Sequence, residues 1–286
     1  MSETSSSEQH NETAAAVTEE ENAPSPDEAS PLGGRHALIT GATRGIGLAI
    51  AEEFCAYGAD VTMLGRDPMA LGEQAERLAR EYQVHVEYML ADVTDCEQVN
   101  NAVEWSGNLL GGIDILVNNA GAARSAPLEQ TDDALWQEML AANLTGCFNT
   151  IRAVTPHMKE KGYGRIINIA STAGLRGYSY VGAYCAAKHG VIGLTRALAR
   201  EFATTGITVN ALCPGYTDTD MTRRTIENIV EKTGKTAEEA LKSLLADNPQ
   251  GRLITPGEVA EAAVFLALPG SAAITGQALA IAGGEV

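Results

Sequence analysis

The run YCAAK places Tyr184 and Lys188 four residues apart, with only small side chains between them. On a helix, residues at this spacing lie on one face, one turn apart. A tyrosine phenol has a pKa of about 10, and a neighbouring ammonium favours the phenolate, so we expect Lys188 to lower the pKa of Tyr184. Such a pair is suited to proton exchange with a bound substrate. The spacing alone is also compatible with a half-buried helix on which the tyrosine packs and the lysine extends into solvent.

The stretch TGATRGIG (40–47) is rich in glycine at positions that suit phosphate binding. Gly41 permits a tight turn, while Gly45 and Gly47 let backbone N–H groups and the start of a helix approach a pyrophosphate. The spacing G-x-x-x-G-x-G differs from the G-x-G-x-x-G dinucleotide fingerprint, and glycines also occur simply to turn a chain. Because the stretch follows a predicted strand and begins a predicted helix, we interpret it as a nucleotide-binding turn.

Charged residues near this turn bear on which nucleotide it binds. Folds that prefer NAD usually carry an acidic residue after the second strand, where this chain has Arg66 and, in the glycine turn, Arg44. Two guanidiniums suit a 2′-phosphate, which favours NADPH over NADH, although Arg66 can also simply begin a solvated loop beside Asp67. Asp92, after the third strand, is a candidate acceptor for the adenine amino group. A helix N-cap is its alternative role, for which Asp95 is better placed.

The segments that must hold these residues in place alternate between short apolar runs and helical patterns. Predicted strands cover 36–40, 60–64, 84–90, 113–118, 164–171, 206–212 and 277–283; predicted helices cover 45–57, 69–82, 95–107, 132–160, 179–204 and 256–268. Near-continuous apolar strands are typical of parallel strands covered on both faces. The pattern predicts an α/β fold, with a single Rossmann-like, doubly wound parallel sheet of about seven strands and helices on both faces.

Two segments fall outside this alternation. Residues 1–32 are expected to be a disordered acidic N-terminal tail, because residues 1–30 hold eight acidic residues, no Lys or Arg and few apolar side chains. The tail is either a solubilising extension or a segment that binds a partner. Residues 33–286 are expected to form one Rossmann-fold domain, in which the largely polar, helical segment 216–250 is interpreted as a small lid over the ligand.

Composition and charge argue against several classes of protein. The chain has 286 residues, 45% of them hydrophobic, and a formal net charge of −17, which disfavours binding to nucleic acid or an anionic membrane. No apolar run approaches the roughly 20 residues needed to cross a bilayer, and the N-terminus lacks a secretory signal pattern. Five scattered cysteines without C-x-x-C pairs favour reduced thiols in the cytoplasm and no metal site.

Taken together, the motifs resemble those of the short-chain dehydrogenase/reductase family over nearly all of residues 34–286. The matching features are TGATRGIG, NNAG (118–121), NLTG (143–146), Ser171 in INIAST, YCAAK and CPGYTDTDM (213–221). They occur in the family's order and spacing, with Ser171 thirteen residues before Tyr184. The segment from Tyr184 to Met221 is most similar to polyketide ketoreductases and 3-oxoacyl-thioester reductases.

The resemblance implies a catalytic role for four residues. Tyr184 would be the general acid, and Ser171 would bond and orient the substrate oxygen. Lys188 would also hold the ribose hydroxyls, with small residues beside it leaving room for the nicotinamide ribose, and Asn143 would anchor a water that relays protons. The alternatives are structural, since Ser171 can cap a strand end and Asn143 can bond backbone within a helix.

The resemblance also implies the residues that contact the cofactor and the substrate. Tyr216, Leu175, Arg176 and Arg124 are candidates for the substrate cleft, where the two arginines either meet a phosphopantetheine or carboxylate or are ordinary surface residues. The cofactor contacts are expected at Gly41, Thr43, Arg44, Gly45, Ile46, Gly47, Arg66, Asp92, Val93, Asn119, Ala120, Gly121, Tyr184, Lys188, Pro214, Gly215, Thr217 and Thr219.

The function predicted from these features is NADPH-dependent reduction of a ketone to a secondary alcohol, the ketone being a 3-oxoacyl thioester or a polyketide-type ketone. One alternative is NAD-dependent oxidation of a hydroxyacyl-CoA or a cyclic secondary alcohol. A second alternative is a non-catalytic dinucleotide-sensing protein. The resemblance further implies a cytoplasmic homodimer or homotetramer with a small-molecule substrate and no nucleic-acid or membrane partner.

Overall fold

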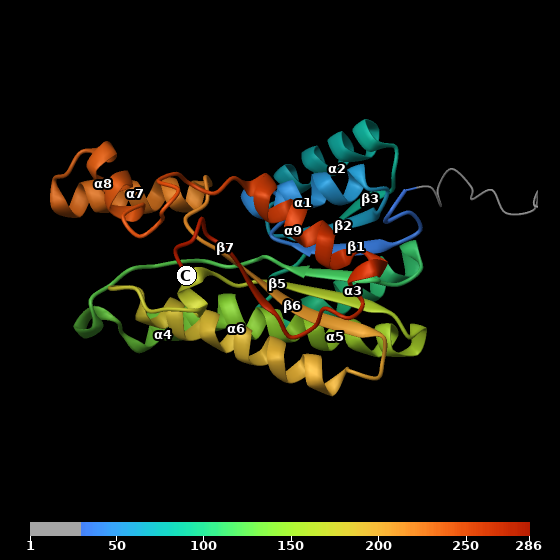
Figure 1. The fold of residues 1–286 in the computed structure, drawn as a ribbon. Coiled ribbons are helices and arrows are strands. Elements are labelled where there is room, and N and C mark those ends of the chain that lie inside the picture. The colour runs from blue at the N-terminus through green and yellow to red at the C-terminus, as the bar shows by residue number, and fades with distance from the viewer. Residues whose placement is uncertain (1–29) are drawn as a thin grey trace, which may run out of the picture.

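A computed structural model of the chain describes residues 30–286 and shows one seven-stranded sheet in which every neighbouring pair of strands is parallel. The predicted tail therefore lies, for residues 1–29, outside the described residues. The strand order β3-β2-β1-β4-β5-β6-β7 confirms the predicted doubly wound sheet (Figure 1). The strands are β1 (His36–Thr40), β2 (Asp60–Gly65), β3 (Val86–Leu90), β4 (Ile115–Asn118), β5 (Gly164–Ile169), β6 (Ile207–Pro214) and β7 (Ala278–Ile281).

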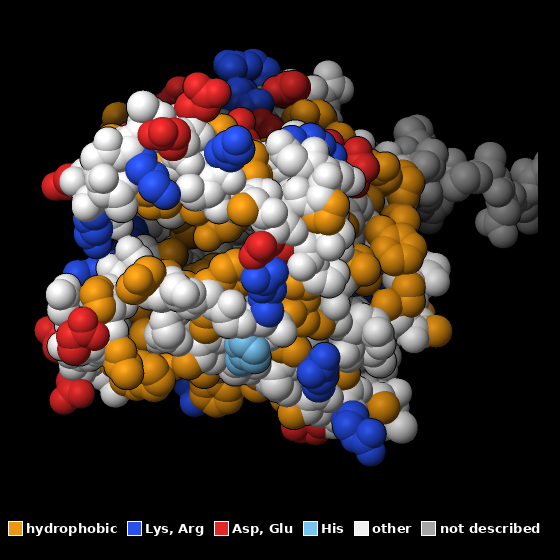
Figure 2. Space-filling view, turned by 60° about the vertical axis from the view of Figure 1, so that its left-hand side comes forward, with side chains coloured by type: hydrophobic (Ala, Val, Ile, Leu, Met, Phe, Trp, Pro, Cys, Tyr) orange, Lys and Arg blue, Asp and Glu red, His pale blue; other side chains and the backbone are white. Residues whose placement is uncertain are grey.

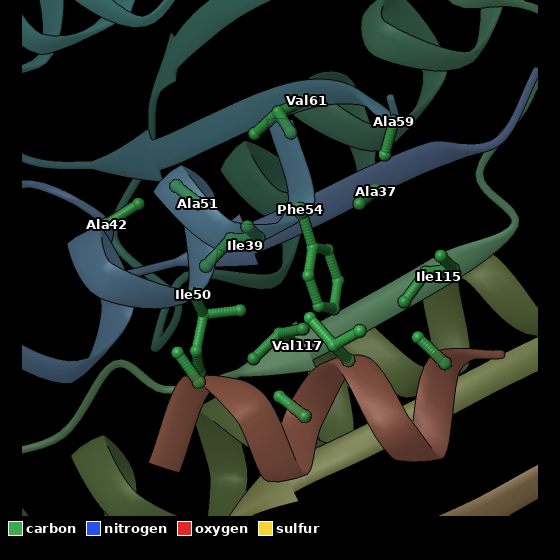
Figure 3. Packing of buried hydrophobic residues seen from close by; sticks show 14 of the residues in the cluster. Ala37, Ile39, Ala42, Ile50, Ala51, Phe54, Ala59, Val61, Ile115 and Val117 are labelled. Carbon is green, nitrogen blue, oxygen red and sulfur yellow. The ribbon is translucent and has the colours of Figure 1, made fainter. Parts of the chain in front are cut away.

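Helices cover both faces of this sheet, as the sequence predicts. One layer consists of α1 (Gly45–Ala56), α2 (Pro68–Tyr82) and α9 (Pro256–Ala267), and the other of α3 (Cys96–Leu110), α5 (Gly146–Lys161) and α6 (Gly182–Glu201). Successive strand residues point to opposite layers: Ile39 of β1 packs with Phe54 of α1, while Leu38 packs in the second core with Val191 of α6 (Figure 3). Burial on both faces explains why the strands read as continuous apolar runs.

Three helix starts are fixed by side chains that the sequence singles out. Asp67 accepts hydrogen bonds from the backbone N–H groups at the start of α2, and Asp95 does the same for α3. Asp95, and not Asp92, is thus the N-cap of α3. Thr255 and Glu258 form a reciprocal capping box at the start of α9. Each cap satisfies donors that a helix end leaves without partners.

The single helix predicted over 132–160 is confirmed as one continuous helical segment over 133–161, which contains a π-helical turn that the sequence does not predict. The structure divides it into α4 (Asp133–Leu140), a π-helical turn at Ala141–Thr145, and α5. A π turn inserts an extra residue into the helical repeat, and such turns are frequent at functional sites. Here the inserted turn contains Asn143, whose side chain bonds the backbone of a distant loop. That contact is tertiary, so the helical periodicity of the segment does not reveal it.

The segment predicted as a lid contains α7 (Asp220–Thr233) and α8 (Ala237–Leu244). Figure 1 shows both helices standing away from the two layers that cover the sheet. The segment connects to the rest of the structure through a hydrogen bond from Asn228 to Ser125 (3.1 Å) and an ion pair between Asp247 and Arg176 (2.7 Å). Over residues 30–286, every helix is too short or too polar to span a membrane.

Candidate active site

The carboxyl ends of the central strands bring the predicted motifs to one edge of the sheet. The glycine turn follows β1, the NNAG motif spans the end of β4, Ser171 follows β5, and Pro214 ends β6. Strand β1 lies between β2 and β4, so the chain leaves it on one side and returns on the other. Ligands of doubly wound sheets bind in the crevice outside the strand ends at this switch point. The fold therefore places the candidate site where such sheets bind nucleotides.

The glycine turn is locked to the NNAG motif by hydrogen bonds. Asn119 Nδ2 donates to the carbonyl oxygens of Thr40 and Gly41, both at 3.0 Å. Thr40 Oγ1 accepts from the backbone N–H groups of Asn119 and Ala120, both at 2.9 Å. A Cβ on Gly47 would lie 2.4 Å from Asn119 Nδ2 and from Gly41 O, so only glycine fits there. The two predicted cofactor motifs thus form one rigid unit.

The start of α1 is suited to an anion. Gly41 and Gly45 both have positive φ values, +65° and +58°, which glycine adopts without strain. Arg44, the N-cap of α1, makes no side-chain hydrogen bond to the first turn, so the helix start is not capped by its own N-cap residue. Backbone N–H groups at such a helix start bind phosphate. The turn residues Thr43, Ile46 and Gly47 belong to this cradle, and its donors fit a dinucleotide pyrophosphate.

The two arginines assigned to a 2′-phosphate each face a different carboxylate. Arg44 Nε lies 3.6 Å from Asp220, and Arg66 Nη1 lies 3.4 Å from Asp92; the arginine side chains are 64% and 80% exposed. Weak pairs at this exposure are readily exchanged for a phosphate. Asp67 is committed to capping α2, so it is not required as a ribose acceptor. The positions fit NADPH, and the assignment of these residues to it stays a prediction.

Asp92 and Val93 form the loop after β3. Asp92 accepts from the backbone and hydroxyl of Thr94, at 2.9 and 2.7 Å, which leaves its carboxylate partly exposed beside Arg66. Val93 packs on Gly146 so tightly that a Cβ on that glycine would lie 2.6 Å from Val93 Cγ2. The loop is therefore fixed against the start of α5. The contacts of Asp92 with the adenine and of Val93 with the cofactor stay predictions.

Ser171 and Tyr184 are brought together at the end of β5. Ser171 is extended, begins the short 3-10 helix Thr172–Gly174, and its Oγ accepts from Ala173 N at 3.1 Å. The structural alternative for Ser171, capping the strand end, is thus also realised. Burial raises the pKa of Tyr184 to about 12, while hydrogen bonding with Ser171 opposes that rise. The Ser171 hydroxyl therefore lies close enough to Tyr184 to favour its deprotonated form in part.

The prediction that Lys188 lowers the pKa of Tyr184 is wrong for the protein alone. Lys188 is 5% exposed, and its Nζ donates to the carbonyl oxygen of Ile169 at 2.8 Å and lies 5.6 Å from the Tyr184 ring centroid. Burial lowers the pKa of Lys188 to about 8, and burial dominates the phenol as well. Ala187 is fully buried, so its small size serves packing and not room for a ribose. Because its pKa is raised, the Tyr184 phenol stays protonated at neutral pH.

Asn143 is held by three hydrogen bonds from the π turn. Its Nδ2 donates to the carbonyl oxygens of Met139 (2.9 Å) and Ala122 (2.8 Å), and its Oδ1 accepts from Ala122 N (3.2 Å). A Cβ on Gly121 would lie 2.6 Å from Asn143 Oδ1 and 3.8 Å from Lys188 Nζ. Gly121 therefore allows Asn143 and Lys188 to approach the same point. The backbone-bonding role considered for Asn143 is present, and it places the side chain beside the lysine.

The residues after β6 return the chain to the glycine turn. Thr217 is buried and its hydroxyl donates to Gly215 O at 3.0 Å, so this side chain is engaged within the loop. Thr219 precedes α7, and its Cγ2 lies 3.2 Å from the position of a Cβ on Gly45. Thr219 is thus in contact with the glycine turn at the start of α1. Pro214 ends β6, and the backbone N–H of Gly215 donates to the carbonyl oxygen of Ile281 at 3.0 Å, which ties the loop to β7.

The four residues predicted for the substrate cleft each have neighbours in the structure. Figure 2 shows a hollow in one face of the molecule, bordered mainly by hydrophobic side chains with charged side chains nearby. Tyr216 packs edge-on against Tyr178, with ring centroids 6.4 Å apart. Leu175 is partly buried against the second core, while Arg176 and Arg124 pair with Asp247 and Glu138. Sequence reasoning missed Tyr178 and Glu285, because no local motif marks either one.

Comparisons with known proteins agree with this geometry. The family model described as short chain dehydrogenase matches residues 35–229. A D-beta-hydroxybutyrate dehydrogenase of Cupriavidus necator is 38% identical over 89% of this chain and 99% of its own length. A putative ketoacyl reductase of Streptomyces coelicolor is 40% identical over 87% of this chain and 95% of its own. The structure of an actinorhodin polyketide ketoreductase variant with NADPH superposes with a TM-score of 0.84 at 40% identity, covering 88% of this chain and 97% of that one.

Fold and comparisons together define an NAD(P)-dependent oxidoreductase. The chain belongs to the short-chain dehydrogenase/reductase family, and it resembles the ketoreductases of that family. It is an enzyme that acts on ketones or the corresponding CH–OH groups. Among residues 30–286, no cluster of His, Cys, Asp or Glu side chains is arranged to hold a metal ion.

Proposed function

We propose that this protein reduces a ketone, either a 3-oxoacyl thioester or a polyketide-type ketone, to a secondary alcohol at the expense of NADPH. The observation that carries the proposal is the convergence of Ser171, Tyr184, Lys188 and Asn143 beside the phosphate cradle. NADPH supplies the hydride that reduces the carbonyl carbon. Tyr184 supplies the proton to the carbonyl oxygen, so the ketone gains a hydride on carbon and a proton on oxygen, which together are two electrons and two protons.

The residues of the chain have separate tasks in this reaction. Ser171 donates to the carbonyl oxygen and holds it against Tyr184, which stays protonated at neutral pH because burial raises its pKa to about 12. Lys188 binds the ribose hydroxyls of the cofactor and, as its pKa of about 8 allows, passes a proton toward Tyr184. Asn143 holds the water through which that proton is replaced. Segment 216–250 closes over the substrate and excludes solvent.

Cofactor preference is the part of the proposal that rests on Arg44 and Arg66. Both side chains are exposed beside the cradle, and a guanidinium binds a phosphate through two parallel hydrogen bonds. We expect kcat/KM to be higher with NADPH than with NADH. Replacing Arg66→Ala should lower kcat/KM for NADPH by about tenfold, roughly 1.4 kcal/mol, and leave NADH almost unaffected. A strong preference of the unmodified enzyme for NADH would overturn this assignment.

A second candidate function is the reverse reaction, NAD-dependent oxidation of a hydroxyacyl-CoA, a cyclic secondary alcohol or a related hydroxy compound. The relative named D-beta-hydroxybutyrate dehydrogenase favours it. Rates with NADPH or NADH should be measured for acetoacetyl-CoA, a cyclic ketone and a bulky aromatic ketone. The reverse rates should be measured with NAD and NADP on the corresponding alcohols. Absence of turnover with every thioester would favour a general alcohol dehydrogenase.

A non-catalytic dinucleotide sensor is the third reading, and the Ser171–Tyr184 pair counts against it because sensing requires no proton donor. Tyr184→Phe is the discriminating variant. We expect it to bind NADPH normally and to lose at least about 100-fold in kcat, the usual worth of a positioned general acid. Turnover equal to that of the unmodified protein would remove Tyr184 from the mechanism.

The remaining proposals concern the assembly and division of the chain. We expect residues 33–286 to act as one reductase domain and residues 1–32 to be dispensable for turnover, which a variant lacking that tail tests. A homodimer or homotetramer is expected, to be measured by light scattering. The cytoplasmic assignment rests on the cysteines, which are all free thiols in the structure.

A further inference from the structure

The segment after β7 carries an acidic side chain to the mouth of the cleft. Gly283 and Gly284, with φ values of +62° and +93°, turn the chain back over the carboxyl edge of the sheet. Glu285 Oε2 then lies 3.0 Å from the position that a Cβ on Gly215 would occupy. In Figure 1 the mark at this end of the chain lies between the lid helices and α6. Glu285 therefore stands beside the end of β6, next to Tyr216.

A hydrogen bond from Tyr178 holds Glu285, whose charge also acts on Tyr216. The Tyr178 hydroxyl donates to Glu285 Oε1 and lies 2.7 Å from Thr172 Oγ1, one residue beyond Ser171. Burial and the negative charge of Glu285 both raise the pKa of Tyr216. Glu285 is thus linked through two neighbouring phenols to the residues that handle the carbonyl oxygen. The Tyr178 hydroxyl donates to one oxygen of the Glu285 carboxylate, and no Lys or Arg side chain pairs with it within residues 30–286.

The cationic side chains near the cleft are already engaged. Arg176 pairs with Asp247 at 2.7 Å and also interacts electrostatically with Glu285, so one positive charge faces two negative ones. Arg124 pairs with Glu138 at 2.6 Å. Lys188 is buried and directed at a backbone carbonyl. Among these candidates no cation is left to bind a substrate carboxylate, and the balance of charge beside Tyr216 is negative.

We propose that Glu285 is a specificity-determining residue, which makes the cleft accept ketones without a free carboxylate and reject 3-oxo acids and the corresponding 3-hydroxy acids. This inference rests on the proposed function, because it concerns the substrate of the same site. Two carboxylates a few ångströms apart in a partly desolvated cleft repel each other strongly. A thioester, an ester or a simple ketone meets no such repulsion.

The test compares a free acid with its neutral thioester. Acetoacetate and acetoacetyl-N-acetylcysteamine carry the same ketone, and kcat/KM for each is measured with NADPH for the unmodified enzyme, Glu285→Gln and Glu76→Gln. Glu76 is exposed on α2, so its replacement removes the same charge far from the cleft. We expect Glu285→Gln to reduce the preference for the thioester by about tenfold, mainly through a lower KM for acetoacetate. Glu76→Gln should leave the preference unchanged.

Three results would overturn the inference. The first is equal kcat/KM of the unmodified enzyme for acetoacetate and for the thioester, a result that can be observed without any variant. The second is an unchanged preference in folded Glu285→Gln, and the third is loss of the preference in Glu285→Asp, which keeps the charge. If the enzyme reduces the thioester but the variants leave the preference unchanged, only the inference fails. If it reduces no ketone in the panel, the proposed function fails, and the inference fails with it.

Discussion

Replacing Asn143 tests whether the π turn is held by this side chain. Asn143 is 3% exposed and makes three hydrogen bonds to the backbone of Met139 and Ala122. A buried hydrogen bond contributes about 1 kcal/mol net, so Asn143→Ala loses about 3 kcal/mol and regains roughly 0.5 kcal/mol from the higher helix propensity of alanine. For a domain of this size, the expected net loss lowers Tm by roughly 5–10 °C.

The assay is thermal unfolding without cofactor or substrate, at one protein concentration, because ligands and association both shift Tm. Asn101→Ala, at an exposed position of α3, is the matched control and should change stability by less than about 0.5 kcal/mol. A melting temperature of Asn143→Ala equal to that of the control would show that the three bonds do not hold the turn. Any loss of turnover in Asn143→Ala would then have to be assigned to the loss of the proposed proton relay.

Three other changes have expected outcomes. Gly47→Ala should destabilise the fold by more than about 2 kcal/mol and abolish NADPH binding, since its Cβ would lie 2.4 Å from a backbone oxygen. The measurement is unfolding by urea. Gly72→Ala on α2, where the Cβ meets only ordinary contacts at 3.7 Å, is the control and should be neutral or stabilising in that titration. Lys188 is deprotonated at about pH 8 in the folded protein and near 10.5 when unfolded, so the unfolded chain binds more protons between these values. The stability of the unmodified protein relative to Lys188→Met should therefore rise with pH across that window, by up to roughly 3 kcal/mol; a flat difference would contradict the lowered pKa. Thr255→Ala should cost about 1 kcal/mol in the same assay by removing the capping box of α9, and no loss would mean that Glu258 alone caps the helix.

The sequence predicts the fold well because local chemistry and global pattern agree. Every predicted strand is present, and the main differences are at ends, such as the strand predicted over 164–171, which stops at Ile169. It stops there because Ser171 caps a 3-10 turn instead of continuing the ladder. Apolar runs identify strands that are buried on both faces, whereas the last residues depend on what the loop after them does.

The candidate site is less predictable wherever a contact spans the chain. Motif residues such as Tyr184 and Ser171 are predicted from the resemblance to the short-chain dehydrogenase/reductase family, whose motifs are local in sequence. The bond between Asn143 and Ala122 joins residues 21 apart, and that between Tyr178 and Glu285 joins residues 107 apart. The pKa of Tyr184 was predicted in the wrong direction for a similar reason. Its value depends on burial, which spacing along one helix does not report.

The position of β7 has a consequence for how the chain folds. Strand β6 pairs with β7 in a register that places Ala211 opposite Ala278, and segment 216–250 and α9 lie between the two strands in the sequence. During synthesis, β6 has no partner on that side until α7, α8, α9 and β7 have followed it, and an unpaired edge is prone to association. Closing such a long loop costs little more than closing a shorter one, because the entropy grows with the logarithm of its length. We therefore expect β7 to pair with β6 only after the intervening helices are available, with little additional entropic cost for the long connection.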